Sequence, residues 1–316
     1  MTLSESRPVQ SEKALAIVTR GTDWSETSRI TTLFTREFGK IRALAKGGRR
    51  LKSNFDVAFD LLTVCEVVFI RKASGLELLT EARMNEQFPA LRKNLPALYA
   101  GYYVAELLAE GLQDYDPHPV LFDAALAILR ALGRTAVFYP EREGSTGAEE
   151  EGAVREGEGA PVSQAAGADS PVELGPEVNG ARSVERTAPL RTEAGGGKGS
   201  LLATVSAFEL VWLQELGYSP RLDACATCGR ERLSPTARAF FSPLAGGVLC
   251  PECGPAVADR RMVSGDALLC IRDLTARGAE TALPDETRAE VRQVLGYAVS
   301  CVLGRRPRML NYVDAR

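Results

Sequence analysis

The chain has 316 residues, enough for two or three modest hydrophobic cores, and a formal net charge of −3. Residues 1–10 are polar, without the apolar core of a signal peptide, and no apolar run approaches the roughly 18–20 residues that a membrane span needs. We therefore expect no export and no membrane, but a cytoplasmic protein whose thiols stay reduced.

The first part of the chain, residues 1–82, is predicted to be a β domain. Its expected strands are five short stretches that are rich in apolar and β-branched residues and separated by turn signals: Ala14–Arg20, Arg29–Thr35, Gly39–Lys46, Phe55–Lys72 (one bent strand or two paired ones) and Gly75–Ala82. Five such strands in about seventy residues predict a small closed barrel. The pattern alone does not distinguish an OB-fold from an SH3-like barrel. Of the two, we favour the OB-fold.

Positive charge is concentrated in one stretch of this domain, where seven cations face one acid, Glu37. OB-folds bind single strands when cations follow the phosphates and exposed rings stack on bases. Phe34, Phe38 and Phe55 are candidate rings, but each lies within or beside a strand pattern, so we favour core positions for them. A solvated charged loop is the alternative for the cations. We predict that these cations contact DNA: Arg36, Lys40, Arg42, Lys46, Arg49, Arg50 and Lys52.

From about Phe88 the apolar residues recur every three or four positions, which predicts an amphipathic helix that ends at Gly111. We expect residues 83–316 to form an α-helical bundle, so that the whole chain has an α+β fold. Its further predicted helices are Val120–Leu132 (stopped by Gly133), Leu201–Leu216, Ser264–Arg277 and Pro284–Leu303.

The bundle is interrupted at residues 139–200 by a segment rich in Glu, Gly, Ala, Ser and Pro and without a period. It holds twelve acidic and six basic residues, so its net charge is −6 and the rest of the chain carries +3. Such a composition buries too little apolar surface to offset chain entropy, so we expect a disordered acidic insert. Mimicry of nucleic acid by Glu149–Glu151 is a less favoured interpretation.

Four cysteines form two C-x-x-C pairs, Cys225 with Cys228 and Cys250 with Cys253. The spacing is that of a tetrahedral zinc site with four thiolates, and a strand, a Gly-Gly turn and a returning strand between the pairs would bring them together. Disulfides or simple core cysteines are the alternatives, and nothing suggests export. We therefore predict one structural Zn²⁺ on a hairpin at about 222–256, with no open position for catalysis.

Signs of an enzyme are weak. The chain has one histidine, His118, between two prolines, and no Lys-x-Asp-Gly motif of a nucleotidyl-transferring ligase. Two alternatives to a DNA-binding protein remain: an accessory OB and zinc-ribbon protein of a nucleic-acid enzyme, and a zinc scaffold that binds only proteins.

The order and spacing of several short motifs resemble the bacterial recombination mediator family RecO. The matching motifs are Trp24-Ser-Glu-Thr-Ser-Arg-Ile30, Leu33-Phe-Thr35, Gly39-Lys40, Ala45-Lys-Gly-Gly-Arg-Arg-Leu-Lys-Ser53, Tyr103-Val-Ala-Glu-Leu107, His118-Pro-Val-Leu-Phe122, Phe208-Glu209, Leu216-Gly-Tyr-Ser-Pro220, Leu222-Asp223 and Cys225-Ala-Thr-Cys-Gly229.

The resemblance implies an N-terminal OB-fold and a helical domain that often carries four-cysteine zinc. It also implies a protein without a catalytic reaction or small-molecule substrate, which binds single- and double-stranded DNA and anneals complementary strands. The implied partners are RecR, the single-strand binding protein and, indirectly, RecA, and the implied location is cytoplasmic and nucleoid-associated. The insert at 139–200 is long for this family.

Overall fold

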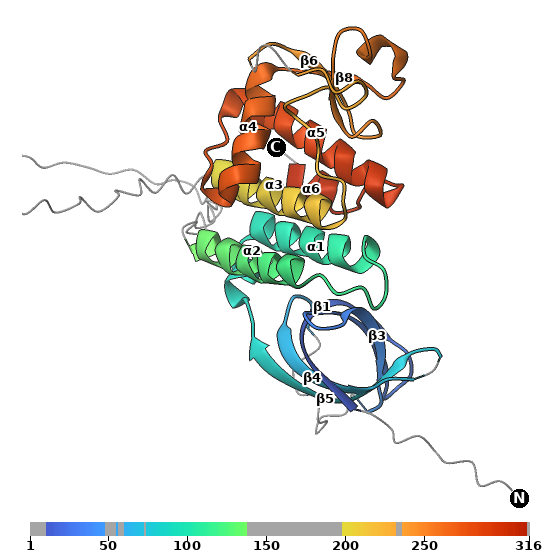
Figure 1. Cartoon of the computed structure of the whole chain (residues 1–316). Coiled ribbons are helices and arrows are strands. Elements are labelled where there is room, and N and C mark those ends of the chain that lie inside the picture. The colour runs from blue at the N-terminus through green and yellow to red at the C-terminus, as the bar shows by residue number, and fades with distance from the viewer. Residues whose placement is uncertain are drawn as a thin grey trace, which may run out of the picture. The chain divides into compact units, whose positions relative to one another are not determined.

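The computed structural model describes residues 11–47, 55, 60–72, 74–137, 198–231 and 236–314 (Figure 1). The acidic insert predicted at 139–200 lies outside these residues, except that a helix already begins at Lys198. None of the described helices is long and apolar enough to cross a membrane.

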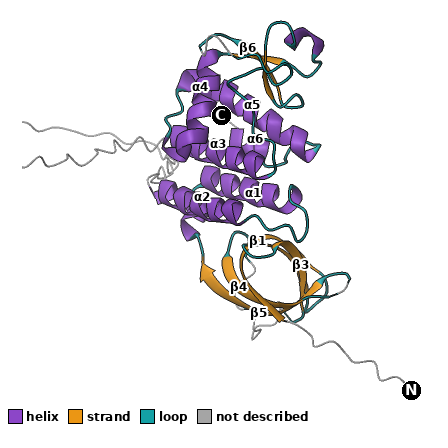
Figure 2. Ribbon diagram, viewed as in Figure 1, coloured by secondary structure: helices purple, strands orange, loops and turns teal. Residues whose placement is uncertain are grey.

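The N-terminal domain is a closed five-stranded barrel with the OB-fold, as predicted. Its strands are β1 (Ser11–Asp23), β2 (Arg29–Thr35), β3 (Gly39–Ala45), β4 (Val64–Ile70) and β5 (Glu77–Glu86). They are arranged in the order β1-β2-β3-β5-β4, and β1 pairs with β4 to close the barrel (Figures 1 and 2). Of the strand pairs, only β3 with β5 is parallel among the described residues.

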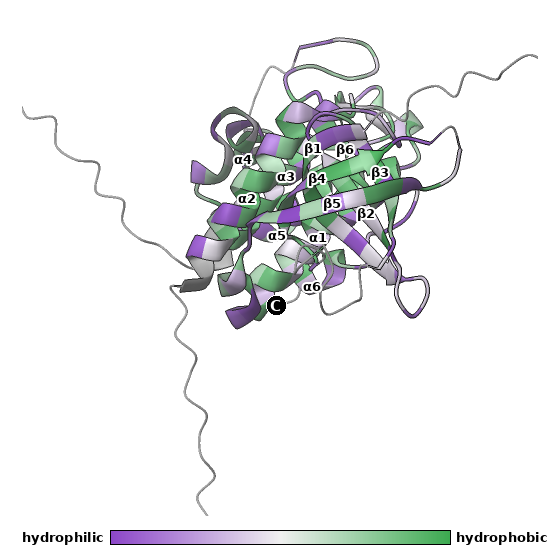
Figure 3. Ribbon diagram, turned by 90° about the horizontal axis from the view of Figure 1, so that it is seen from below, coloured by the Kyte–Doolittle hydropathy of each residue, from purple (hydrophilic) through white to green (hydrophobic). Residues whose placement is uncertain are grey.

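Apart from β2, the bounds of the strands differ from the prediction. β1 extends to Asp23, and β5 continues to Glu86, past the boundary expected at residue 82. The described residues of the stretch Phe55–Lys72 contribute one strand, β4, and Asp60 to Thr63 form a turn that leads into it. Figure 3 shows hydrophobic residues along most of β4 and both hydrophobic and hydrophilic residues along β5. This agrees with their burial, because β4 has no exposed residue and the second half of β5 is largely exposed.

The helices follow the predicted order and pack as one body. They are α1 (Leu95–Glu110), α2 (Pro119–Val137), α3 (Lys198–Glu215), α4 (Gly265–Arg277), α5 (Asp285–Leu303) and the short α6 (Leu310–Asp314), with single turns η1 (Pro89–Lys93) and η3 (Gly278–Glu280). The side chain of Asn94 accepts a hydrogen bond from Ala97 N (3.0 Å) and thereby caps α1. Ser264 caps α4 in the same way.

The expectation that Gly133 ends the second helix is wrong. α2 passes through Gly133 and continues to Val137. A β-carbon at Gly133 would meet no atom within 4 Å, so neither a close contact nor a special turn requires glycine there. Glycine in a helix interior costs only about 1 kcal/mol relative to alanine, which packing of a long helix readily offsets.

The barrel has an interior core of its own, and its outer wall shares a second hydrophobic core with the helices. Ile17, Phe34 and Val64 point out of the barrel wall and belong to the same buried cluster as residues of α1, α2 and α3. The ring centroids of Phe34 and Phe122 lie 5.8 Å apart across this junction. A β-carbon at Gly39 would come within 2.0 Å of the backbone oxygen of Asp116, so the α1–α2 connection lies directly on the barrel.

A small three-stranded sheet carries the cysteine pairs. The predicted hairpin is present as β6 (Ala239–Ser242) and β7 (Gly247–Leu249), and β8 (Arg261–Val263) adds a third strand in the order β7-β6-β8. Phe241, Val248 and Val263 pack from this sheet into a core with α4 and α5. The turn η2 (Gly254–Ala256) follows the second cysteine pair directly.

Candidate metal centre and nucleic-acid face

The four cysteines of the two C-x-x-C pairs meet in one cluster. Their Sγ atoms all lie within 4.8 Å of one another, and those of Cys228 and Cys250 are 3.8 Å apart. Zinc–thiolate bonds of about 2.3 Å in a tetrahedron place sulfurs about 3.8 Å apart. The cluster can therefore hold a metal ion with four sulfur ligands.

Backbone hydrogen bonds hold each cysteine pair in a tight turn. Gly229 N donates to Cys225 O and Gly254 N to Cys250 O, both at 2.9 Å. Ala226 N donates to Val248 O at 2.8 Å, which fixes the first pair on the hairpin. Cys253 N donates to the sulfur of Cys250 at 3.4 Å.

The two glycines that follow the cysteine pairs are required for different reasons. Gly229 has φ +75°, a left-handed conformation that suits glycine. The φ of Gly254 is not positive, but a β-carbon there would come within 2.1 Å of the Phe240 ring. Gly229 therefore permits the tight turn, whereas Gly254 makes room for a ring of β6.

The environment of the cluster favours thiolate at Cys225 and Cys250, whereas hydrogen bonds with Cys250 and Cys228 raise the pKa of Cys253 to about 12. Burial opposes ionisation of Cys225, but hydrogen bonds from the backbone of Cys228, Cys250 and Thr227 outweigh it and lower its pKa to about 6. Hydrogen bonding to the backbone of Cys253 likewise lowers the pKa of Cys250. Because the thiolate is the form that binds metal, this donor arrangement suits a metal site.

Of the seven predicted DNA contacts, Arg36 and Lys40 are bound within the protein. Arg36 donates two hydrogen bonds to the carboxylate of Asp123 on α2, both at 2.9 Å, and this pairing raises the pKa of Arg36. Lys40 Nζ donates to the carbonyls of Ala109 (3.1 Å) and Leu112 (2.6 Å), and its side chain is only 13% exposed. Both cations thus join the barrel to the helices.

Arg42 and Lys46, in contrast, are not bound to other described parts of the protein by ion pairs. Both are exposed, and neither has an ion pair with another residue in the described part of the chain. Arg42 lies between the buried Ile41 and Ala43 on β3, so it points outward from the barrel, and Lys46 directly follows the buried Ala45 at the end of the strand. Arg49, Arg50 and Lys52 lie outside the described residues.

The three phenylalanines near these cations are core residues, as favoured from the sequence. Phe34 and Phe55 are buried, and Phe38 packs edge-on against Phe69 with ring centroids 5.6 Å apart. None of the three is therefore a free ring for a base.

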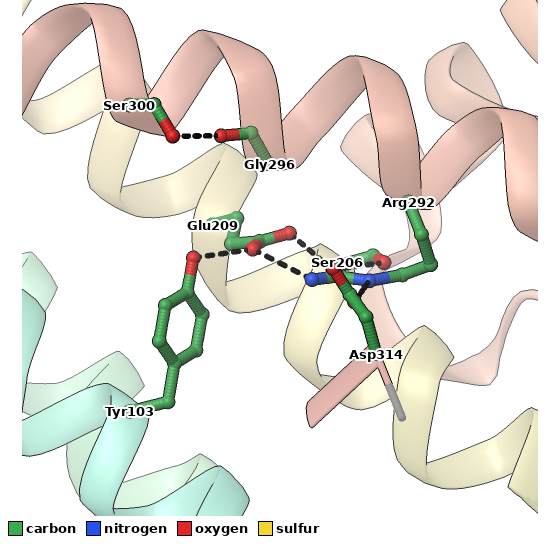
Figure 4. Close-up of polar contacts among 7 residues, drawn as sticks. All are labelled: Tyr103, Ser206, Glu209, Arg292, Gly296, Ser300 and Asp314. Carbon is green, nitrogen blue, oxygen red and sulfur yellow. Dashed lines mark hydrogen bonds and ion pairs between the residues drawn. The ribbon is translucent and has the colours of Figure 1, made fainter. Parts of the chain in front are cut away.

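A buried polar cluster in the helical domain was not predicted (Figure 4). Glu209 of α3 is fully buried and Arg292 of α5 is 5% exposed. Both guanidinium nitrogens Nη1 and Nη2 of Arg292 donate to the Glu209 carboxylate, and Nε donates to Asp314 on α6 at 2.9 Å. Tyr103 of α1 donates to Glu209 at 2.7 Å.

This cluster joins four helices through the carboxylates of Glu209 and Asp314 and the guanidinium of Arg292. Burial alone would lower the pKa of Arg292, but the charges of Glu209 and Asp314 outweigh it and raise the pKa. Burial and the charge of Glu209 raise the pKa of Tyr103 well above its usual value. A sequence signal existed, because Phe208-Glu209 places an acid inside an apolar helical stretch.

Arg305, near the C-terminal end of the described chain, forms ion pairs with another helix. Arg305 follows the end of α5 and pairs with Glu106 and Glu110 of α1. The carboxylate of Glu106 also accepts from the backbone nitrogens of Arg308 and Met309, both at 2.8 Å. Arg305 thus joins the end of α5 to α1.

Comparison with known proteins agrees with this architecture. The family model "Recombination protein O N terminal" matches residues 10–88, and "Recombination protein O C terminal" matches residues 92–142 and 193–310. The "DNA repair protein RecO" of Rhodopirellula baltica is 32% identical over 86% of this chain and 77% of its own. That of Anaeromyxobacter sp. (strain Fw109-5) is 27% identical over 96% of this chain and 95% of its own. The chain therefore belongs to the RecO family of DNA repair proteins.

Proposed function

We propose that this chain is a non-catalytic mediator of DNA repair and homologous recombination. It binds single- and double-stranded DNA, anneals complementary strands, and helps RecA to load onto DNA that is coated with the single-strand binding protein. RecR and the single-strand binding protein are its direct partners, and it works in the cytoplasm at the nucleoid, without a small-molecule substrate.

The observation that carries DNA binding is the exposed side of β3, which pairs with β2, together with the end of that strand. Arg42 and Lys46 are exposed there and are not neutralised by any described acid, whereas Arg36 and Lys40 are used at the helix junction. OB-folds bind oligonucleotides on this strand pair and its adjoining loops. Phosphate contacts by such cations supply affinity without reading sequence.

We further propose that the cysteine cluster holds one structural Zn²⁺. Four thiolates fill a tetrahedral ion, so no position remains for a catalytic water. The ion would hold the hairpin β6–β7 against the first cysteine pair. Since the nucleic-acid face lies on the barrel, the metal has no direct part in DNA binding.

The salt dependence of oligonucleotide binding tests the proposed DNA face. Each phosphate neutralised on a single strand contributes a log–log slope of about −0.7, so losing Arg42 and Lys46 to alanine should reduce the slope by about 1.4. The additional change of Arg49, Arg50 and Lys52 to alanine should reduce it by about two more. All oligonucleotide sequences should weaken alike. An unchanged slope in all variants would move the DNA site elsewhere.

Lys40 and Lys46 form a matched pair of variants that separates structure from binding. Lys40→Ala leaves the carbonyls of Ala109 and Leu112 without a donor, so the unfolding free energy should fall by about 1–3 kcal/mol while the salt slope stays constant. Lys46→Ala should reduce the slope and leave urea denaturation unchanged. A reduced slope with normal stability in Lys40→Ala would return Lys40 to the DNA contacts.

Strand annealing distinguishes the mediator from a zinc scaffold that binds only proteins. Complementary oligonucleotides coated with the single-strand binding protein should anneal in the presence of this chain and without nucleotide. Annealing should fall in the Arg42→Ala/Lys46→Ala variant. A wild-type chain that neither binds nor anneals DNA at low salt would favour the scaffold.

A further inference from the structure

Trp24 is an exposed aromatic residue in the connection between β1 and β2. Its side chain is 66% exposed, although tryptophan is usually well covered in a folded domain. The connection is short and internally bonded: Trp24 N and Ser25 N both donate to Ser28 O, at 3.0 and 3.2 Å. Ser28 N in turn donates to the Ser25 hydroxyl at 3.1 Å. The ring is therefore presented on an ordered turn.

The strand register places Trp24 at the same barrel edge as Lys46. Asp23 pairs with Arg29 across β1 and β2, and Arg29 pairs with Ala45 across β2 and β3. Trp24 directly follows Asp23 and Lys46 directly follows Ala45. The exposed ring and the exposed cation thus leave β1 and β3, the two strands that flank β2, at the same end of the barrel.

The charges at this edge also favour an anion. Asp23 lies 3.7 Å from the Arg29 guanidinium and is balanced by it, and Arg20 is a further exposed cation on β1. Glu26 is the remaining acid of the turn. The cations Arg20, Arg29 and Lys46 outnumber the acids Asp23 and Glu26, so a polyanion can approach the ring along β3.

We propose that Trp24 stacks on a base of single-stranded DNA whose phosphates meet Lys46 and Arg42. This proposal rests on the proposed DNA binding and adds a residue that distinguishes single-stranded from double-stranded DNA. In a duplex the faces of the bases are covered by their neighbours, whereas a single strand offers a free face to a ring. Trp24 therefore favours single strands over duplexes, while the cations bind both.

Substitution of Trp24 separates stacking from charge in one experiment. Loss of a stacked base contact weakens single-strand binding by about 5- to 100-fold, and Trp24→Phe should retain much of the affinity. Because the ring neutralises no phosphate, Trp24→Ala should lower affinity equally at each salt concentration and leave the log–log slope unchanged. Binding to duplex should change less than twofold.

Tryptophan emission gives an independent measurement, because the chain has two tryptophans and Trp212 is fully buried. Titration of the wild-type chain with oligo-dT should quench the emission of Trp24, and Trp24→Phe should show no quenching. Met84→Ala, at another exposed apolar side chain of the barrel, is the control and should bind normally.

The outcomes separate the stacking role from the proposed function. Normal affinity of Trp24→Ala for oligo-dT, with Arg42→Ala/Lys46→Ala impaired, overturns stacking and leaves DNA binding in place. Normal DNA affinity with weakened binding of a protein partner assigns Trp24 to a protein interface and also overturns it. Absence of any oligonucleotide binding by the wild-type chain overturns the proposed function, and stacking with it.

Discussion

Replacement of Arg292 by alanine is expected to lower the unfolding free energy by about 3–5 kcal/mol, because it leaves a buried carboxylate without its counter-charge. Glu209 is fully buried, and its remaining donor in the cluster of Figure 4 would be the Tyr103 hydroxyl. One neutral hydrogen bond does not replace a bidentate guanidinium. Urea denaturation followed by circular dichroism measures the loss.

Two control variants identify the cause of that loss. Arg130→Ala removes a bidentate pair with Glu86 that is partly exposed to solvent, and should cost at most about 1 kcal/mol. Arg292→Met combined with Glu209→Leu removes both charges and should recover most of the stability, because a buried pair contributes little net free energy over apolar packing. A single variant as stable as the wild type would show that the cluster is not a structural requirement.

Cys228→Ser is expected to release the metal from the cysteine cluster. Structural zinc contributes an apparent 10–16 kcal/mol in small modules, which is the largest effect we expect in this chain. The loss should stay local, because Phe241, Val248 and Val263 also pack against α4 and α5. Hydrogen exchange should accelerate at the amides of Ala226, Gly229 and Gly254, which bond within the two turns.

Elemental analysis of anaerobically purified protein is the direct measurement, with one zinc per chain expected in the wild type. Cys301→Ser is the matched control, since Cys301 is a partly buried thiol of α5 outside the cluster and should leave the zinc content unchanged. Oligonucleotide binding should be normal in both variants. Wild-type protein without zinc, prepared without chelator, would contradict the assignment of the ion.

Local patterns predicted the elements well where they were long or strongly periodic. The bounds of β2 agree residue for residue, and the separation of the cysteine pairs predicted a hairpin that is present. β8 and α6 were missed because three to five residues do not establish a period. Strand and helix ends shifted where packing, and not local propensity, determines them.

Partnerships between distant charges could not be read from the sequence. Arg36 and Lys40 belong to the same basic stretch as Arg42 and Lys46, and only the folded chain brings Asp123 and the carbonyl of Leu112 to the first two. Glu209 and Arg292 are 83 positions apart and meet only through helix packing. The density of positive charge identified the basic stretch in the sequence. Tertiary contacts determine which of its cations are bound within the protein and which remain exposed.

The apolar junction between barrel and helices has a consequence for synthesis and for truncation. The barrel strands leave the ribosome before α1 and α2, so Ile17, Phe34 and Val64 on the outer wall remain exposed to water until those helices follow. A fragment cut between β5 and α1 would keep that surface uncovered and would tend to aggregate. The smallest soluble piece of this protein that retains the barrel should therefore extend at least through α2.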